Sequence, residues 1–324
     1  MVGERARRLW ANLAVHDLLL VGFHGWILIW GASVYTGAGD SVAGLRLSAA
    51  LFVTVTATVL LVRADLLPAG PLRGAWYRLA LIGSLPVSYY GIACLARSAD
   101  LRWFDQELWA IDRMLFGVTP AEWMVRLNRP DVIEWFAFFY QSYYYFLIAF
   151  LVVPPLADRG LRLQELMVAA TVVSVFGHTG YTLVPGIGPY QVMEFSEPVR
   201  GGYWWAMVQE TVRAEHALDI FPSMHTAMPT MFTLHLIRHR RRPPHRFLWP
   251  VMAFITANVI VATMLLRWHW AIDIVAGLAL AAAGHVASVY VARRERGRGV
   301  ADDRQVVWEP VFRWQRGAAR PTAS

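Results

Sequence analysis

Two polar stretches decide how this chain folds: Phe221-Pro222-Ser223-Met224-His225 and Arg267-Trp268-His269-Trp270-Ala271-Ile272-Asp273. Each stretch lies at the end of an apolar segment that is long enough to cross a lipid bilayer. Ionisable side chains at the edges of membrane spans are costly to keep there, so they are candidates for function by default. We therefore expect the functional site between Ile220 and Gly277.

The first stretch has the pattern of a helix start. Pro222 fits the first helical turn, where its missing N–H is not needed. Ser223 and His225 would then lie beside free backbone N–H groups and the positive end of the helix dipole, which together favour a phosphate or another anion. Pro229 cannot donate to the carbonyl of His225, so we expect a bend there.

The second stretch pairs a histidine with a carboxylate. His269 and Asp273 are four residues apart and share one helix face. An aspartate in that position can bind one imidazole nitrogen and leave the other to attack or to accept a proton. Arg267 supplies a planar, permanently charged donor for phosphate oxygens, and Gly277 permits the close approach of another helix.

Each of these residues also has a structural interpretation. A histidine at the end of a span is more often an interfacial residue than a catalyst. Ser223 fits a helix cap, and Arg267 fits a side chain that extends along apolar surface toward water. Asp273 is harder to explain in this way, because an unpaired carboxylate at the start of a long apolar helix is expensive. The combination of residues in this order favours a functional site.

The overall composition indicates a polytopic membrane protein. Hydrophobic residues make up 56% of the 324 residues, and apolar runs recur at the length of a membrane span. We expect an all-α membrane helix bundle with about eight transmembrane helices, the first of which is not a cleaved signal peptide. The expected spans are residues 13–34, 45–62, 79–95, 132–153, 163–183, 222–237, 248–265 and 270–291.

The distribution of arginine predicts the orientation of these spans. The net charge is +7, and there is no lysine. Basic loops stay in the cytoplasm, which places inside the N-terminus, the loops 63–78, 155–162 and 238–246, and the C-terminal tail. The loops 97–130, 184–219 and 265–270 are then outside, and they border the candidate site. We expect an integral protein of a bacterial-type plasma membrane with its active site on the outer face.

The same features limit the partners of the protein. The basic residues lie between spans, so they indicate topology rather than a surface for nucleic acid. Cys94 is the one cysteine, which rules out an internal disulfide and disfavours a structural zinc site. We expect no cofactor. The expected partners are the bilayer and a lipid phosphate or phospholipid substrate.

The pattern Pro-Ser-x-His followed by His-x-x-x-Asp-x-x-x-Gly resembles the type-2 phosphatidic acid phosphatase superfamily of membrane lipid phosphatases and phosphotransferases. Two further segments are similar to its inositol phosphorylceramide synthase-like branch. They are Gly-Tyr-Thr-Leu-Val-Pro-Gly-Ile-Gly-Pro-Tyr at 180–190 and Asp-Arg-Met-Leu-Phe-Gly at 112–117 with Pro120. The resemblance covers roughly residues 100–290, and the two histidine motifs are its specific part.

The resemblance implies roles for the motif residues and a domain organisation. The histidine that matches His225 protonates the leaving group, the one that matches His269 is the nucleophile, and the aspartate that matches Asp273 orients it. A six-helix phosphatase-like core would occupy residues 76–295, after two N-terminal spans in 1–75 and before a cytoplasmic tail at 296–324. The candidate phosphate or substrate ligands are Ser223, Arg267, Tyr181 and Arg129, although a helix-terminating turn explains Tyr181 about as well.

The sequence departs from the family pattern at three positions. Met224 replaces the glycine that is usual in the phosphatases, as a larger residue does in the synthase-like branch. Thr263 stands where the family has an arginine six residues before the nucleophile, and Arg267 is its nearest substitute. Glu122 stands seven residues before Arg129, where the family has a basic residue, so Arg129 matches its motif only in part.

We therefore expect a phosphatase or phosphotransferase that cleaves a lipid phosphate or phosphodiester through a phosphohistidine, with water or an inositol-type alcohol as acceptor. The enzymatic alternative is a metal-dependent intramembrane hydrolase that uses His225, His269 and Asp273 as ligands, with His178 and His216 as further candidates. The non-enzymatic alternative is a transporter. Its polar site would lie at the bilayer midplane, whereas here the polar residues lie at span ends.

Overall fold

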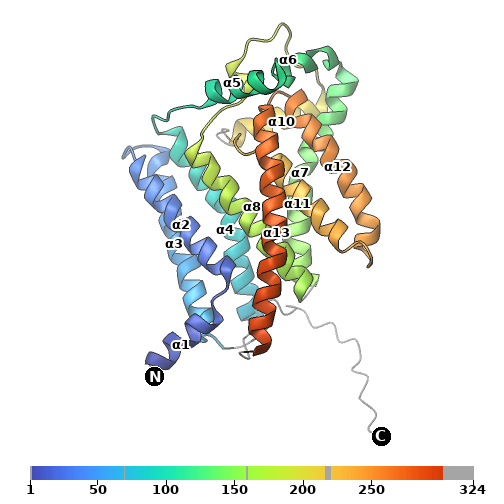
Figure 1. Cartoon of the computed structure of the whole chain (residues 1–324). Helices are drawn as coiled ribbons and strands as arrows, with labels where there is room; N and C mark the ends of the chain where they lie inside the picture. The colour runs from blue at the N-terminus through green and yellow to red at the C-terminus, as the bar shows by residue number, and fades with distance from the viewer. Residues whose placement is uncertain (1, 69, 158–159, 216–219, 302–324) are drawn as a thin grey trace.

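The computed structural model describes residues 2–68, 70–157, 160–215 and 220–301. Within these residues the chain is helical and contains no strand, which confirms the all-α prediction (Figure 1). His216 and the part of the expected tail from residue 302 onward lie outside the described residues.

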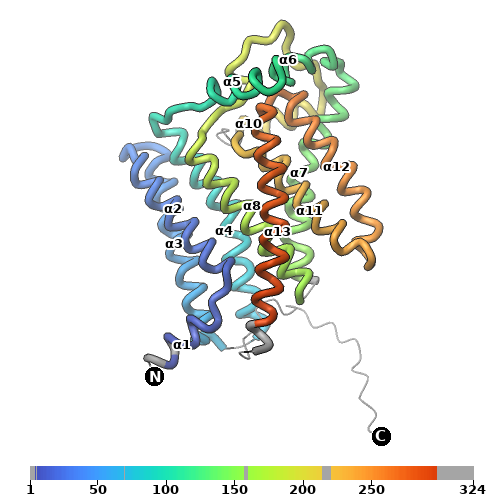
Figure 2. The backbone as a smooth tube through the Cα atoms, viewed as in Figure 1, coloured from blue at the N-terminus to red at the C-terminus, as the bar shows by residue number. Residues whose placement is uncertain are grey.

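Among the described residues, seven helices are long and apolar enough to cross a membrane, as expected for an integral membrane protein. They lie side by side in one bundle, and Figure 2 shows the path of the backbone through it. These helices are α2 (Val15–Ser33), α3 (Asp40–Arg63), α4 (Pro71–Arg97), α7 (Pro130–Ala157), α8 (Leu161–Leu183), α12 (His245–Leu265) and α13 (Ala271–Ala301).

The helix at the sixth predicted span has nearly the predicted length, but it is not among these seven helices. α11 (Met224–Arg238) has 15 residues, which corresponds to roughly 22 Å. It packs against α7, α8, α12 and α13, and most of its side chains are buried. Because neighbouring helices rather than lipid cover α11, it does not have to match the thickness of the hydrocarbon layer.

Short helices cover one end of the bundle. α5 (Asp105–Phe116) and α6 (Pro120–Trp123) lie across the end at which α13 begins, and the 3-10 helix η1 (Met124–Leu127) follows them (Figure 1). The segment 184–219, which we expected to be a polar loop, contains α9 (Pro189–Val192) and α10 (Tyr203–Glu215). α1 (Val2–Asn12) lies at the opposite end of the bundle.

Proline interrupts the helices less than we expected. Pro86 lies inside α4, and Pro154 and Pro155 lie inside α7, which we expected to end before them. A proline removes one helical hydrogen bond, but surrounding groups in a helix bundle can satisfy the freed backbone. The carbonyl of Pro155 itself lies in the last turn of α7, where a helix provides no partner, and Arg78 donates to it at 2.9 Å.

α4 also begins earlier than the predicted span. Its first residue is Pro71, and a proline is compatible with the first helical position. Arg73 and Arg78, which we expected beside a turn, are therefore buried side chains of α4. Arg73 donates to Asp65 at 2.6 Å, so this buried cation is paired with a carboxylate.

One hydrophobic core runs through the bundle. Buried side chains of α2 and α4 belong to the same cluster as those of α8 and α11, for example Phe23, Leu81, Val173 and Phe232. The helices that we assigned to an N-terminal unit, residues 1–75, therefore share their packing with the rest of the chain.

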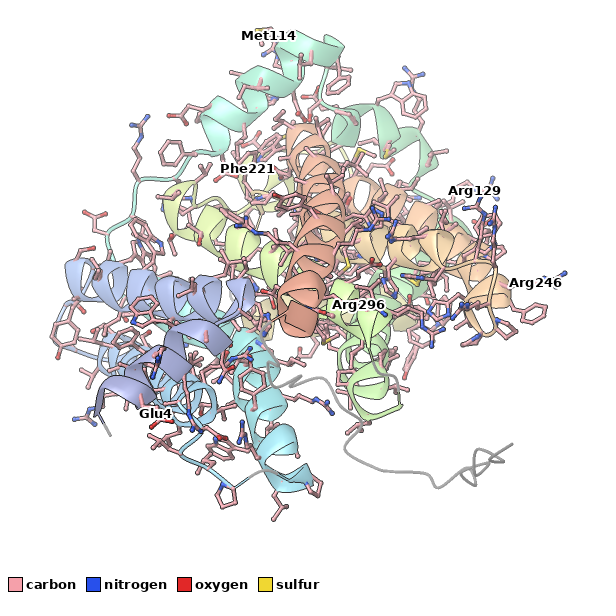
Figure 3. The ribbon with its side chains drawn as sticks, turned by 60° about the horizontal axis from the view of Figure 1, so that its bottom comes forward. Glu4, Met114, Arg129, Phe221, Arg246 and Arg296 are labelled. Carbon is pink, nitrogen blue, oxygen red and sulfur yellow. The ribbon has the colours of Figure 1, made fainter. Side chains whose placement is uncertain are left out.

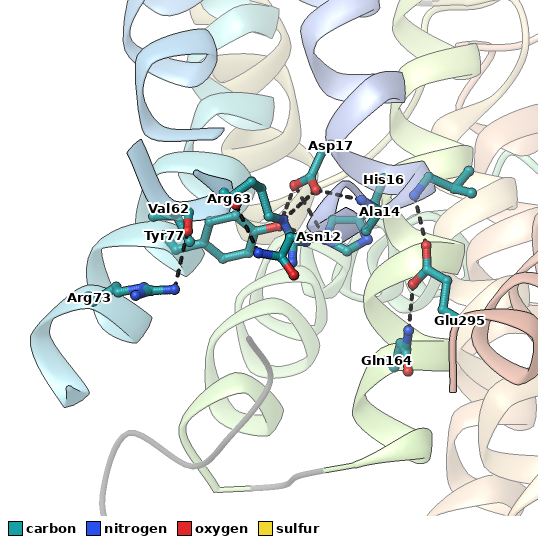
Figure 4. A network of polar contacts seen from close by, with 11 residues as sticks. Asn12, Ala14, His16, Asp17, Val62, Arg63, Arg73, Tyr77, Gln164 and Glu295 are labelled. Atoms are coloured by element: carbon teal, nitrogen blue, oxygen red, sulfur yellow. Dashed lines mark hydrogen bonds and ion pairs between the residues drawn. The ribbon is translucent and has the colours of Figure 1, made fainter. Parts of the chain in front are cut away.

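A buried ion pair fixes the start of α2 to α3 and α4 (Figure 4). Arg63 donates through Nε to Asp17 Oδ2 at 2.6 Å and through Nη2 to the hydroxyl of Tyr77 at 2.7 Å. Tyr77 also donates to Asp17, and its hydroxyl is 2.8 Å from His16 Nε2. A buried ion pair is tolerated when further hydrogen bonds satisfy both ions, and the tyrosine and the histidine provide them.

Glu295 of α13 joins this region to the rest of the bundle (Figure 4). Its Oε1 accepts the backbone N–H of Val15 at 2.7 Å, and its Oε2 accepts from Gln164 of α8 at 2.6 Å. The N–H of Val15 belongs to the first turn of α2, where no partner exists within the helix. α2, α8 and α13 are thus connected at the end that holds α1.

The segments that we assigned to the cytoplasm gather at that same end. Asn12 donates to the carbonyl of Arg63 at 2.9 Å, and Arg238 pairs with Glu165 of α8 at 2.8 Å. The segments that we assigned to the outside meet at the opposite end, where α5 contacts α13. Which end faces the cytoplasm remains a prediction from the arginine distribution.

This orientation predicts which cysteines can be labelled in intact cells. The native Cys94 would be replaced by serine, and a single cysteine introduced by Tyr203→Cys or Arg241→Cys, both at exposed positions. A membrane-impermeant maleimide should label position 203 in intact cells and position 241 only after permeabilisation. Labelling of position 241 from outside would reverse the proposed topology.

Candidate active site

His269 lies between α12 and α13, at the end of the bundle that α5 covers. Its Nδ1 is 3.0 Å from the carbonyl oxygen of Ile220. A carbonyl oxygen only accepts, so this contact puts the imidazole proton on Nδ1 and the lone pair on Nε2. The backbone N–H of His269 donates to the carbonyl of Thr263 at 3.2 Å. A neutral imidazole held in this tautomer can act as a nucleophile or as a base through Nε2.

Asp273 contacts both this imidazole and the start of its own helix. Its Oδ2 is 3.4 Å from His269 Nδ1 and accepts the backbone N–H of Trp270 at 2.8 Å. Its Oδ1 is buried and has no hydrogen-bond partner. The i, i+4 spacing thus brings the carboxylate to the ring, as predicted, but the Ile220 carbonyl is the nearer partner of Nδ1.

His225 faces His269 from the first turn of α11, with 6.0 Å between the two ring centroids. Tyr140 stacks on His225 at 4.3 Å with an interplanar angle of 16°, and Tyr143 lies at 4.2 Å. These rings hold the imidazole plane in position. His225 Nε2 is buried and makes no hydrogen bond to any of the residues that the structure describes. A buried nitrogen without a partner costs free energy, so this atom is suited to exchange a proton with a bound group.

Ser223 is the N-cap of α11. Its Oγ accepts the N–H of Thr226 at 3.3 Å, and its own N–H donates to the carbonyl of Asp273 at 3.0 Å. We expected Pro222 in the first helical turn. The helix begins at Met224, so Pro222 instead precedes the cap. The reason is that a serine oxygen is a favourable cap for the free N–H groups of the first turn.

Two glycines bring the backbones of α8, α11 and α13 together beside the histidines. A Cβ added at Gly277 would lie 2.6 Å from the carbonyl oxygen of Ser223, which confirms the close approach predicted for this residue. A Cβ at Gly177 would lie 2.2 Å from the sulfur of Met224. Met224 thus occupies the space that Gly177 leaves, which explains how a large residue fits where the phosphatases usually have glycine.

A buried aspartate of α5 caps the first turn of α13. Asp112 accepts the backbone N–H of Ala271 at 2.8 Å and that of Ile272 at 2.9 Å. It also accepts the hydroxyl of Thr119 at 2.7 Å and is 0% exposed. The first N–H groups of a helix have no partner inside it, so Asp112 makes it possible to bury the start of α13 next to His269.

A second aspartate of α5 holds the segment that follows α8. Asp105 Oδ1 accepts the N–H of Gly188 at 2.8 Å and the indole N–H of Trp270 at 3.1 Å. Its Oδ2 accepts the N–H of Ile187 at 3.0 Å. Gly188 has φ of 81°, and a Cβ there would lie 2.3 Å from the carbonyl oxygen of Trp268. The 180–190 segment is therefore fixed directly against the turn that carries His269.

Arg267 is buried beneath the segment that leads to α10. Its guanidinium carbon is 3.9 Å from the ring centroid of Phe195, and Nη1 donates to the carbonyl of Glu197 at 2.9 Å. No carboxylate pairs with it within the described residues. Burial lowers the pKa of Arg267, although a guanidinium stays charged in proteins. The site therefore contains a cation that is not neutralised by an acidic side chain.

The backbone of Arg267 is strained. Its φ is 67°, a region that residues other than glycine rarely adopt. The N–H of Tyr190 donates to its carbonyl at 2.7 Å, and its own N–H donates to Met264 at 3.0 Å. Strained backbone of this kind occurs often at functional sites.

α10 covers the site from the side of α7. Glu134 of α7 accepts the N–H groups of Gly202, Trp204 and Trp205 at 2.7, 3.0 and 3.0 Å, which caps the start of α10. Behind this cap, Trp205 packs in the same hydrophobic cluster as Tyr140 and Trp268. The segment that we expected to be a loop over the site is thus an anchored helix.

Two of the predicted ligands make other contacts in the structure. Arg129 is at the surface, where 69% of its side chain is exposed and it pairs with Asp131 at 2.8 Å (Figure 3). Tyr181 is buried in α8, with its ring 5.7 Å from His178 and 6.2 Å from Tyr89 of α4. We therefore leave both residues out of the proposed reaction. Within the described residues, no group of three or more His, Cys, Asp or Glu side chains is arranged to hold a metal ion.

Several residues that build the site were not predicted as site residues. Ile220 acts through its carbonyl, and Asp105 has no motif around it, so no local signal marks either one. Asp112 is part of the segment 112–117, which we expected to matter only because it resembles the synthase-like branch. Tyr140 and Tyr143 belong to no motif, but their i, i+3 spacing places both on the helix face toward His225.

The fold and the site define a polytopic membrane protein with two histidines facing each other at one end of its helix bundle. A model of the PAP2 superfamily matches residues 106–287. This is more than half of the chain, and the protein belongs to that superfamily. Membership supports a phosphatase-type activity and agrees with the resemblance of the two histidine motifs. Comparisons with curated proteins and with solved structures gave no significant match.

The role of Asp112 can be tested by substitution. Asp112→Ala would leave two buried N–H groups of α13 and the Thr119 hydroxyl without their acceptor, at a cost of about 1–3 kcal/mol for each group. We expect a clearly lower melting temperature in detergent and a strong loss of phosphatase turnover. The control is Asp131→Ala, which removes an exposed carboxylate. If the two variants behave alike, Asp112 does not support the site.

Proposed function

We propose that this protein is a membrane phosphatase or phosphotransferase that cleaves a lipid phosphate or phosphodiester through a phosphohistidine on His269. The observation that carries the proposal is the contact between His269 Nδ1 and the Ile220 carbonyl at 3.0 Å. It fixes the tautomer in which Nε2 is the nucleophilic atom.

In the first step, His269 Nε2 attacks phosphorus, so that a P–N bond forms while the P–O bond to the leaving group breaks. The leaving alkoxide takes a proton from His225, which faces His269 across 6.0 Å between ring centroids. At that separation the two rings are close enough to contact one another, so the phosphoryl group binds at their edges, within reach of one nitrogen of each ring. A general acid in this position lowers the barrier most for leaving groups of high pKa.

In the second step, the acceptor attacks the phosphohistidine. Water or an alcohol forms the new P–O bond and gives its proton to His225, and the P–N bond to His269 breaks. Asp273, at 3.4 Å from His269 Nδ1, stabilises the positive charge that the ring carries while it is phosphorylated. The cycle returns both histidines to their starting protonation.

The charge of the phosphoryl oxygens has two sources of stabilisation. The N-terminus of α11, which begins at Met224 after the Ser223 cap, contributes the positive end of a helix dipole. Arg267 is a buried guanidinium that pairs with no carboxylate in the part of the chain that the structure describes, and its backbone adjoins the His269 turn. Phosphoryl transfer depends mainly on such positioning and charge stabilisation. Arg267 is our candidate for the arginine that the family has at the position of Thr263.

A lipid substrate fits the surroundings of the site. The histidines lie within a bundle of apolar helices. Tyr140 and Tyr143 of α7 pack on His225, and Trp205 of α10 belongs to the same hydrophobic cluster as Tyr140. Such rings are common where one end of a ligand is apolar and the other is wet. The similarity of residues 112–117 and 180–190 to the inositol phosphorylceramide synthase-like branch supports transfer of a headgroup to an inositol-type hydroxyl. With the arginine-rich end in the cytoplasm, the site opens on the outer face.

The nucleophile can be identified by trapping. His269→Ala should abolish turnover of every substrate, because no phosphohistidine can form. Asp273→Asn should lower kcat strongly with a smaller change in KM, because it removes charge but keeps an acceptor for Trp270. With labelled substrate and a quench that avoids acid, peptide mapping should find the label on the peptide that contains His269. Label on another peptide, or full activity of His269→Ala, would refute the mechanism.

The general acid makes a separate prediction about leaving groups. His225→Ala should reduce turnover of an alkyl phosphate much more than that of an activated aryl phosphate, which needs little protonation. The control is His24→Ala, which removes another buried histidine. His24 is hydrogen-bonded to Ser84 and does not belong to either histidine motif. This control should change both substrates by the same factor. Equal losses in His225→Ala would assign that residue a structural role.

The proposed chemistry also predicts the effect of chelation. Because imidazole, guanidinium and helix N–H groups provide the nucleophile and the charge stabilisation, turnover should survive excess EDTA. If EDTA abolishes activity and a divalent ion restores it, the metal-dependent hydrolase is favoured instead. The same result with a neutral phosphotriester would show that the ion does more than bridge an anionic substrate.

A further inference from the structure

A basic cavity lies at the end of the bundle opposite the two histidines. Its volume is ≈ 510 Å³, within the range of small-ligand pockets. Five arginines and one histidine line it: Arg162, Arg238, Arg241, Arg242, Arg296 and His239. None of these residues belongs to the motifs that carry the proposed reaction.

Three chain segments that are distant in sequence form this cavity. Arg162 is in the first turn of α8, Arg238 is the last residue of α11, and Arg296 is near the end of α13. Seen from this end of the bundle, nitrogen-bearing side chains gather between Arg296 and Arg246 (Figure 3). The cavity therefore depends on the fold and is not simply one basic stretch of sequence.

The acidic groups at the cavity do not balance its charge. Glu165 accepts both Nε and Nη2 of Arg238, at 2.8 and 2.9 Å, and also contacts His239 Nε2 at 2.8 Å. Within the described residues, no ion pair is formed by Arg241, Arg242 or Arg296. Converging guanidinium groups repel one another, so an anion bound between these three arginines would stabilise their arrangement.

The general preference for basic residues on the cytoplasmic side explains part of this charge, but not its arrangement. Arg240, Arg246 and Arg294 are exposed at the same end and do not line the cavity. They are sufficient as topology signals and as contacts to an anionic membrane surface. The convergence of five further arginines around one hollow is the observation that these roles leave unexplained.

We propose that this cavity binds a phosphate anion that carries two or more negative charges, as an anionic phospholipid headgroup or as a free polyphosphate. Planar guanidinium groups bind phosphate oxygens in a bidentate manner. The start of α8, where Leu161 and Arg162 line the cavity, adds the positive end of a helix dipole. Basic pockets between transmembrane helices are a known way to bind phospholipid headgroups.

The test measures binding to the full-length protein in detergent micelles. The probes are inorganic pyrophosphate, dioctanoyl phosphatidic acid and, as a zwitterionic control, dioctanoyl phosphatidylcholine. Binding is measured in the His269→Ala variant, which does not hydrolyse the probe during the measurement. We expect saturable binding of at least one anionic probe, weakened by salt because the contacts are ionic, and no comparable binding of phosphatidylcholine.

Two matched triple variants separate the cavity from general surface charge. Arg241→Gln/Arg242→Gln/Arg296→Gln removes three cavity arginines that form no ion pair, and Arg240→Gln/Arg246→Gln/Arg294→Gln removes the same charge beside the cavity. The first should weaken binding by about tenfold or more, because charge-assisted bidentate contacts are lost. The second should leave the affinity within about twofold, since exposed arginines that do not line the cavity make no bidentate contact with its ligand. Equal weakening in both variants, or no saturable binding of either anionic probe, would overturn the proposal.

Two further comparisons complete the test. If the glutamine variant of the cavity is not monodisperse, Arg241→Lys/Arg242→Lys/Arg296→Lys keeps the charge and should still weaken binding, because lysine lacks the planar fork. Unchanged affinity in this lysine variant would count against a built phosphate site. Tighter binding of phosphatidic acid than of pyrophosphate would identify a lipid headgroup as the ligand, and the reverse order would identify a soluble polyphosphate.

Discussion

The bonds from two carboxylates of α5 to backbone N–H groups are the constraint on which the candidate site depends. Asp112 accepts two N–H groups from the first turn of α13, and Asp105 holds the segment after α8. Burying a helix start without such acceptors is costly. Because α5 lies across the end of the bundle, the position of His269 depends on a contact that joins residues 159 positions apart in the sequence.

Polar side chains are buried in this protein in two different ways. In the network of Asp17, Arg63 and Tyr77, each charge has close partners, and the network connects α2 to α3 and α4. Near His269 the opposite holds: His225 Nε2 has no hydrogen bond, and Arg267 has no paired carboxylate among the described residues. A paired buried charge is consistent with a structural role, whereas an unpaired group suits a ligand that brings the missing charge.

The two ends of the bundle therefore have complementary chemistry. Carboxylates fix the backbone at the end with the two histidines, and arginines converge at the other end around a cavity. α8, α11 and α13 extend from one end to the other. Their close packing depends on Gly177 and Gly277, where a side chain would collide with α11. The same three helices thus carry residues of both ends, which ties the spacing of the histidines to the packing along the whole bundle.

The sequence by itself determined the helical class, most of the spans and the pairing of His269 with Asp273, because these follow from local patterns. Lipid requires each backbone group to be satisfied within its own segment, so apolar length predicts helices, and the i, i+4 spacing brings the carboxylate to the ring. Only the tertiary structure decided that the Ile220 carbonyl is the nearer partner of His269, that neighbouring helices cover α11, and that Arg129 lies at the surface. Those features depend on contacts between distant segments, which no local pattern encodes.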